Sequence, residues 1–290
     1  MRILEREVTA GGLSRSYLLM LPEAADGPVP LIVNLHGSGL DPHDQLRVSG
    51  SHRFAARGAV VLAPGGTIPY RLMDGWPEGR AWNVPGAPLP YEQEVRDDTP
   101  DDVGFIAGLI GMLTSGGAGP GVRIDPQAVH LVGYSAGARL ACHVAAAVPW
   151  LASVACVAGI RPPSDISASS IAVLAIHGRD DPLNPYEGGA GPRWNESVED
   201  AVAAWARVSG CLPHPRSRTS KAGVVELRYD RDGQPGPPVR LITVPGVGHA
   251  WPGSRDALHL ARFGPSGTFD ATARLWRFFA GQRQRTRPTT

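Results

Sequence analysis

A serine flanked by glycines lies near the middle of the chain, in the sequence GYSAG at residues 133–137. The apolar run 129–132 precedes it and an Ala- and Leu-rich stretch with helical spacing follows, which predicts a sharp strand-to-helix turn that presents the Ser135 hydroxyl. Glycine suits both flanking positions because the backbone approaches closely in such a turn. Ser135 is therefore the candidate nucleophile of an acyl transfer, and a surface serine in a glycine-rich loop is the alternative.

Three histidines lie well beyond this serine and after the later predicted strands: His214, His249 and His259. Of these, His249 is the candidate base that would accept the serine proton. His249 lies in GVGHAWPG, directly after the apolar run VRLITVPG at 239–246, and hence on a loop at the end of a predicted strand. His214 lies in a Pro- and Arg-rich stretch, and no strand precedes His259. The sequence therefore favours His249 over the other two.

A catalytic histidine needs a carboxylate to orient it, and the run IAVLAIHGRDDP at 171–182 offers Asp180 and Asp181 just after a predicted strand. Asp181 is the preferred partner because Pro182 biases it toward an extended backbone and a fixed loop position. Asp180 remains an alternative, as does a pair of solvated loop acids. The order serine, acid, histidine along the chain is the order found in α/β-hydrolases.

An attacked carbonyl develops negative charge on its oxygen, which backbone N–H groups must stabilise. We expect one such donor at Ala136, just after the serine, and the second at Ser38, with Gly37 allowing a sharp turn after a predicted strand. His36 and His177 each precede a glycine at a strand end, and we interpret them as supporting hydrogen-bonding residues rather than bases. No His, Cys or carboxylate residues have metal-ligand spacing, so neither a metal nor an organic cofactor is expected.

These residues require a scaffold of strands, and apolar runs of strand length recur between stretches of helical spacing. The first two runs, at 2–9 and 14–21, flank a Gly-containing link and predict an antiparallel hairpin. The later runs, which mostly do not alternate, are 30–37, 59–66, 128–135, 153–159, 171–178 and 239–246. Such runs are typical of strands covered on both faces. The expected fold class is α/β: an α/β-hydrolase fold with a mostly parallel central sheet, an antiparallel N-terminal hairpin and helices on both faces.

Capping residues and helical spacing mark four helices. The first begins at Thr99-Pro100-Asp101-Asp102, where a capping Thr, a Pro at the first helical position and two acids precede helical spacing as far as Leu113. The others are expected at 135–148, 197–208 and 270–280.

Residues 66–92 have neither the strand nor the helix period, and they contain several aromatic side chains. A long loop of this composition favours a functional role. Trp76 and Trp82 from this loop, together with Trp251, are candidates to line the substrate site. Core or lid packing is the alternative for all three, because large aromatic rings serve both purposes.

The composition supports one domain that binds a small molecule. The 290 residues are 42% hydrophobic, and we expect a catalytic domain over 1–282 and a flexible basic tail over 283–290 that contains Arg283, Arg285 and Arg287. The 28 Lys and Arg residues nearly balance the 27 Asp and Glu residues. This balance argues against nucleic acid or an anionic membrane as a partner and favours a neutral small-molecule ester. The sequence gives no signal for an oligomeric state.

The cysteines Cys142, Cys156 and Cys211 do not form a disulfide framework, and the first two lie in apolar runs that predict burial. No stretch approaches the roughly 20 apolar residues that span a bilayer, and the start MRILEREVTA lacks the apolar core of a signal peptide. The chain as it stands is expected to be cytoplasmic, whereas prior removal of an export signal would make it secreted.

The sequence resembles the poly(3-hydroxybutyrate) depolymerase and feruloyl-esterase-like family of α/β-hydrolases, from about residue 15 to about residue 280. The motifs that carry the resemblance are LHG at 35–37, DDVGFI at 101–106, GYSAG, HGRDDPLNPYEGG at 177–189, the stretch 205–211 ending in GC, GHAWPG at 248–253 and LWRFF at 275–279. The resemblance implies hydrolysis of carboxylic esters, with Ser135, Asp181 and His249 as nucleophile, acid and base.

The chain also departs from this family. Its members often have Cys at the position of Ser38 and Asn at the position of Ala136. Neither a polymer-binding module nor a signal peptide is visible, which favours a small soluble ester over an insoluble polymer. An acyltransferase or thioesterase acting on a biosynthetic intermediate would use the same three residues. A non-catalytic small-molecule binding protein is more remote, because it would have no need of all three.

Overall fold

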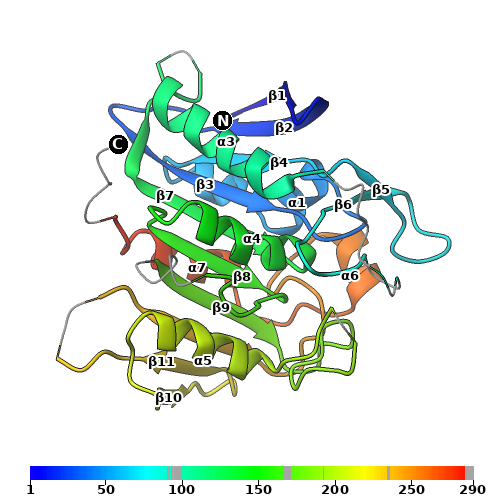
Figure 1. The fold of residues 1–290 in the computed structure, drawn as a ribbon, viewed down its shortest axis with the longest axis vertical. Helices are drawn as coiled ribbons and strands as arrows, with labels where there is room; N and C mark the ends of the chain where they lie inside the picture. The colour runs from blue at the N-terminus through cyan, green and yellow to red at the C-terminus, as the bar shows by residue number, and fades with distance from the viewer. Residues whose placement is uncertain are drawn as a thin grey trace.

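A single ten-stranded sheet forms the centre of the molecule in this computed structural model, which describes residues 1–89, 92, 94, 100–119, 121–165, 171–191, 193–233 and 236–284. The strand order is β1-β2-β4-β3-β7-β8-β9-β12-β11-β10 (Figure 1). The strands from β4 to β12 in this order are parallel, and antiparallel pairs complete both edges. The strands are β1 Arg2–Ala10, β2 Leu13–Leu21, β3 Val29–Leu35, β4 Val60–Pro64, β7 Ile124–Tyr134, β8 Ser153–Val157, β9 Ala172–Gly178, β10 Arg216–Thr219, β11 Val225–Tyr229 and β12 Val239–Val244.

The apolar runs of the sequence become the buried strands. Every residue of β4, β8 and β9 is buried, because helices cover both faces of the sheet at these strands. The N-terminal hairpin of β1 and β2 is antiparallel, and its turn residues Gly11 and Gly12 have φ of 57° and 76°. Positive φ at both positions matches a tight turn to the twist of the two strands. The predicted fold class is confirmed.

Helices lie on both faces of the sheet, as Figure 1 shows for α3, α4 and α5 on one face and α7 on the other. They are α1 Pro42–Val48, α2 His52–Ala55, α3 Asp102–Gly116, α4 Ala136–Ala147, α5 Val198–Val208, α6 Ala257–Phe263 and α7 Ala271–Phe279. Buried side chains of α3, α4 and α5 belong to one apolar cluster, and those of α1, α2 and α7 belong to a second. The sheet therefore separates two cores.

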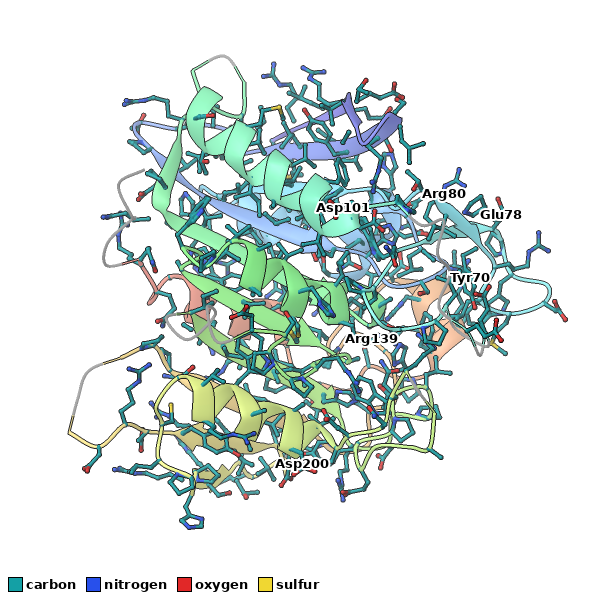
Figure 2. All side chains as sticks on the ribbon, viewed as in Figure 1. Tyr70, Glu78, Arg80, Asp101, Arg139 and Asp200 are labelled. Carbon is teal, nitrogen blue, oxygen red and sulfur yellow. The ribbon has the colours of Figure 1, made fainter. Side chains whose placement is uncertain are left out.

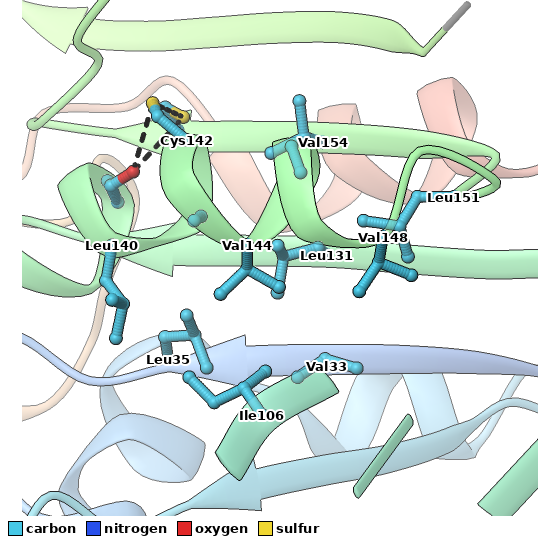
Figure 3. Packing of buried hydrophobic residues seen from close by; sticks show 14 of the residues in the cluster. Val33, Leu35, Ile106, Leu131, Leu140, Cys142, Val144, Val148, Leu151 and Val154 are labelled. Carbon is cyan, nitrogen blue, oxygen red and sulfur yellow. Dashed lines mark hydrogen bonds between the residues drawn. The ribbon is translucent and has the colours of Figure 1, made fainter. Parts of the chain in front are cut away.

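The helix after the candidate nucleophile is fixed by the first core. Leu140 and Val144 of α4 are fully buried, and they belong to the same cluster as Leu131 of β7, Leu35 of β3 and Ile106 of α3 (Figure 3). Burial of side chains of this size stabilises the fold by about 1.5–3 kcal/mol each. Rigid packing of α4 fixes the turn from which it starts.

The predicted burial of Cys142 and Cys156 is confirmed. Both side chains are 1% exposed, and their sulfur atoms lie 3.7 Å apart within the core. Both therefore behave as small apolar residues.

Three of the four predicted helices, α4, α5 and α7, lie within one or two residues of the expected limits. The predicted start of α3 is wrong in its capping residue. Asp101 caps this helix, because its Oδ1 accepts a hydrogen bond from Gly104 N at 2.7 Å, and Pro100 precedes the cap. Thr99 lies outside the described residues. Asp caps a helix as well as Thr does, so the sequence alone did not decide between them.

The sequence predicted a long loop at residues 66–92, and this prediction is wrong in part. These residues contain a two-stranded antiparallel sheet of β5 Ile68–Tyr70 and β6 Gly79–Ala81. Strands of three residues are too short to produce a periodic signal.

The expected C-terminal tail is described only in part. Arg283 forms an ion pair with Asp125, and Gln284 N donates to Gln127 O at 2.8 Å, so these two residues contact β7. Arg285 and Arg287 lie outside the described residues, and the domain limits stay a prediction. Within the described part of the chain, none of the helices combines the length and the apolar character needed to cross a membrane.

Candidate active site

Ser135 lies in a strained turn between β7 and α4. Its φ of 55° and ψ of −117° are unusual for a residue with a side chain, and its N–H donates to Val157 O at 2.9 Å. The flanking glycines allow this turn: a Cβ at Gly133 would lie 2.2 Å from Gly137 O, and one at Gly137 would lie 2.5 Å from Leu35 O. The turn presents the Ser135 side chain at the carboxyl end of the sheet, as the sequence predicted.

The structure brings Ser135, His249 and Asp181 together from three distant parts of the chain. His249 Nε2 lies 2.9 Å from Ser135 Oγ, and His249 Nδ1 lies 2.8 Å from Asp181 Oδ2. His249 is 3% exposed and Asp181 is 4% exposed, so water competes little for these hydrogen bonds. The Ser135 hydroxyl can therefore pass its proton to His249 Nε2, while Asp181 faces the opposite nitrogen of the imidazole.

The alternative residues lie elsewhere. Asp180 is exposed, and its Oδ2 accepts a hydrogen bond from Gly246 N at 2.9 Å. His214 is also exposed. His259 is buried near the site, but its Nε2 accepts a hydrogen bond from Trp251 N at 2.9 Å, and burial lowers its pKa to about 3.

Asp181 is held as a carboxylate by its surroundings. Its Oδ1 accepts hydrogen bonds from Leu183 N and Asn184 N, both at 2.9 Å. Burial acts to raise the pKa of Asp181, but the charge of His249 and the hydrogen bonds from His177 and His249 outweigh burial and hold this pKa well below its ordinary value. An ionised Asp181 fixes the His249 proton on Nδ1 and leaves Nε2 free to accept the serine proton.

The predicted supporting histidines do contact this site. His177 Nε2 lies 3.3 Å from Asp181 Oδ2 and 2.9 Å from Asn184 O, so a proton on this nitrogen is shared by two acceptors. His36 is the first residue after β3: its Nε2 accepts from Gly66 N at 3.0 Å, and its Nδ1 lies 2.9 Å from Gly37 O. Burial lowers the pKa of His36 to about 4, so the ring is neutral at pH 7.

The expected oxyanion donors lie beside the nucleophile. Ser38 and Ser135 line one small cavity, and Ala136 follows Ser135 at the start of α4. In the described part of the chain, the N–H groups of Ser38 and Ala136 donate to no backbone carbonyl. The full lining of the cavity is Gly37, Ser38, Leu72, Tyr134, Ser135, Leu183, Asn184, Arg193, His249 and Phe263. Free N–H groups beside a nucleophile can stabilise charge that develops on a bound carbonyl oxygen.

No family model matches the chain, but a relative is found among curated proteins. A protein of Nocardia uniformis subsp. tsuyamanensis named "Putative esterase NocK" is 31% identical over 276 residues, which cover 86% of this chain and 74% of that protein. The chain belongs to this esterase-like family of α/β-hydrolases.

Solved structures support the same fold for this α/β-hydrolase. An acetyl xylan esterase from Aspergillus awamori has a TM-score of 0.61 at 14% identity, over 90% of this chain and 99% of the other. A thermostable esterase has a TM-score of 0.59 at 16% identity, over 97% of this chain and 63% of the other, so our chain spans less than two thirds of that protein. At these identities the similarity shows the fold alone.

Two of the three predicted substrate-site tryptophans of this α/β-hydrolase pack in the interior. Trp82 is 1% exposed, stacks on His36 and donates its indole N–H to His36 O at 2.8 Å. Trp251 is fully buried, and its indole N–H lies 3.2 Å from Thr272 Oγ1. Neither lines the cavity at Ser135, so core packing describes them and the prediction is corrected.

Trp76 lies nearer the cavity. It is half-buried, and its ring lies edge-on to Phe263, with 5.5 Å between the ring centroids. Since Phe263 lines the cavity, a role for Trp76 in contacting substrate remains a proposal.

Several residues at the site were not predicted from the sequence. Leu183 and Asn184 follow the acid directly, and their place in the motif after β9 was an available signal. Arg193 comes from a Gly- and Pro-rich loop between β9 and α5 that has no periodic pattern, and Phe263 ends the short helix α6. Only the folded chain places these two beside Ser135.

Proposed function

We propose that this α/β-hydrolase cleaves carboxylic esters through an acyl-enzyme on Ser135. The observation that carries the proposal is the hydrogen-bonded series Ser135 Oγ, His249 Nε2, His249 Nδ1 and Asp181 Oδ2, with separations of 2.9 and 2.8 Å. The family relationship to an esterase agrees with it.

The reaction proceeds in two halves. Ser135 Oγ attacks the ester carbonyl while His249 Nε2 takes its proton, and the N–H groups of Ser38 and Ala136 receive the developing oxyanion. The imidazolium then gives the proton to the departing alcohol, which leaves an acyl group on Ser135. Water attacks this acyl-enzyme with His249 again as base, and the carboxylic acid is released. Asp181 stabilises the imidazolium in both halves.

The substrate class we propose is a small or oligomeric ester, of the kind cleaved by the poly(3-hydroxybutyrate) depolymerase and feruloyl-esterase-like proteins that the sequence resembles. The motifs HGRDDPLNPYEGG and GHAWPG support this finer assignment, because they supply Asp181 and His249. Transfer of the acyl group to an alcohol or amine is the competing outcome, and product analysis with such an acceptor present separates transfer from hydrolysis.

The test compares two serine variants. Ser135→Ala should lower kcat for p-nitrophenyl acetate by at least 10⁴-fold, and this variant should not react with a fluorophosphonate probe. Ser217→Ala, which changes an exposed serine of β10, should keep both properties. Unchanged circular dichroism should accompany both substitutions. Retention of full activity by Ser135→Ala would refute the proposed mechanism.

A further inference from the structure

Three arginines from separate segments lie around the candidate nucleophile. Arg193 lines the same cavity as Ser135 and His249. Arg139 lies on α4, one helical turn from the nucleophile, and its backbone N–H donates to Ser135 O at 3.1 Å. Arg161 follows β8, and the charges of Arg161 and Arg193 both act on Arg139. Figure 2 shows Arg139 at the end of α4 that faces the loops after β9.

The guanidinium of Arg139 is buried with unused hydrogen-bond donors. The residue is 2% exposed, and its Nε and Nη1 atoms have no hydrogen-bond partner among the residues that the structure describes. Burial first, and then the charges of Arg193 and Arg161, lower the pKa of Arg139 well below its ordinary value. An arginine nevertheless stays protonated in proteins. A desolvated positive charge therefore lies on a residue one helical turn from the nucleophile.

No carboxylate of the described residues forms an ion pair with Arg139 or Arg161. Arg161 Nη2 donates to Asn195 Oδ1 at 2.9 Å, and its Nη1 has no hydrogen-bond partner in the described part of the chain. A buried arginine usually pairs with a carboxylate, as Arg15 does: it is 1% exposed and forms an ion pair with the buried carboxylate of Asp102. Arg139 is as deeply buried as Arg15 but lacks such a partner. A ligand anion would supply the missing charge and acceptors.

We propose that Arg139, Arg161 and Arg193 form a subsite for a carboxylate carried by the ester substrate, an inference that rests on the proposed function. The planar guanidinium group matches a carboxylate through paired hydrogen bonds. Since one helical turn is about 5.4 Å, the carboxylate would lie within a few bonds of the ester carbonyl. Monoesters of short dicarboxylic acids have this shape. The balanced net charge favoured a neutral ligand, but it averages over the whole surface and does not report a local cluster.

The kinetic test uses two esters of matched length, mono-4-nitrophenyl glutarate and 4-nitrophenyl valerate, which differ by a carboxylate in place of a methyl group. The unmodified enzyme should prefer the glutarate ester in kcat/KM. Arg139→Met should lower the ratio of the two kcat/KM values by about 10- to 100-fold, the effect of charge-assisted hydrogen bonds. Arg218→Met, on the exposed strand β10, should leave the ratio unchanged. A preference for valerate, or an unchanged ratio in Arg139→Met, would overturn the proposal.

The melting temperature of a variant distinguishes a ligand-binding role of Arg139 from a structural role. Arg139 has no ion-pair partner among the described residues, so replacing its buried charge by an apolar side chain of similar size should raise the melting temperature of Arg139→Met. A lower melting temperature would mean that groups of the chain itself hold the guanidinium, and it would contradict the subsite.

A binding experiment tests the carboxylate subsite independently of catalysis. Calorimetry should detect binding of glutarate to the Ser135→Ala variant. The double variant with Ser135→Ala and Arg139→Met should bind glutarate at least tenfold more weakly. Inorganic phosphate serves as a second probe, and tighter binding of phosphate than of glutarate would contradict the assignment to a carboxylate. Hydrolysis that survives Ser135→Ala would refute the proposed function alone, whereas absent glutarate binding would refute the subsite alone.

Discussion

At the scale of single residues, two adjacent aspartates provide a matched comparison. Asp181→Asn should lower kcat by about 10³- to 10⁴-fold, because an amide at this position favours the wrong tautomer of His249. Asp180→Asn should keep nearly full activity, since Asp180 is exposed and its side chain accepts a hydrogen bond from the loop N–H of Gly246. The activity of both variants is measured from initial rates of p-nitrophenyl acetate hydrolysis. Equal losses in the two variants would show that the acid has been assigned to the wrong side chain.

The sequence placed the candidate reacting residues better than it placed the residues around them. Ser135, Asp181 and His249 each follow an apolar run, and the carboxyl ends of parallel strands meet at one edge of the sheet. The side chain of Arg139 had no such signal, because an arginine within a helical pattern normally faces water. The burial of Trp82 and Trp251 likewise depends on contacts with distant residues, among them His36 and Thr272.

At the scale of elements, a buried histidine joins β7, β8 and α7. His130 Nδ1 lies 2.8 Å from Ser153 Oγ, and its ring stacks on Phe279 with 4.9 Å between centroids. Burial, followed by the charge of Arg283, lowers the pKa of His130 to about 3. The unfolded chain therefore binds this proton first, near pH 6.5. The stability that neutral His130 contributes is complete above about pH 6.5 and is lost as the pH falls toward 3.

Replacing this histidine should flatten the pH dependence of folding. Between pH 7 and pH 5, the free energy of unfolding of the unmodified chain should fall by about 2 kcal/mol more than that of His130→Asn. Urea titrations at the two pH values measure the difference. His52→Asn is the control, because the His52 side chain is exposed and is surrounded by water in both states. If the free energy of unfolding falls as steeply in His130→Asn as in the unmodified chain, the pH dependence does not come from His130.

The elements that the sequence predicted are those with strong apolar signals. The parallel strands and α4, α5 and α7 combine such runs with clear ends, and Ser197 and Asp270 cap the latter two helices. The edge strand β10 was missed because all four of its residues are exposed and two are arginines. A solvated edge strand has no hydrophobic pattern, and only its antiparallel pairing with β11 defines it.

At the scale of the whole molecule, one buried ion pair joins three segments that are far apart in the sequence. Arg15 from the N-terminal hairpin contacts Asp102 at the start of α3, and Asp102 Oδ2 also accepts from Asn83 N at 2.6 Å. The Arg15 guanidinium lies 3.9 Å from the centre of the Phe105 ring. The ion pair thus links the N-terminal hairpin to α3. The hydrogen bond from Asn83 links the segment that carries Trp82 to the same helix.

Breaking this pair from one side should cost more than removing both charges. Arg15→Met alone and Asp102→Asn alone should each lower the free energy of unfolding by about 3–5 kcal/mol, because each leaves an uncompensated or mismatched buried group. The double variant should lose less than the sum of the two single losses, since the Asn side chain can still accept from Asn83 N. Urea unfolding of the four proteins completes the cycle. Strictly additive losses would mean that the two charges do not depend on each other, and that the hairpin is joined to α3 by apolar packing alone.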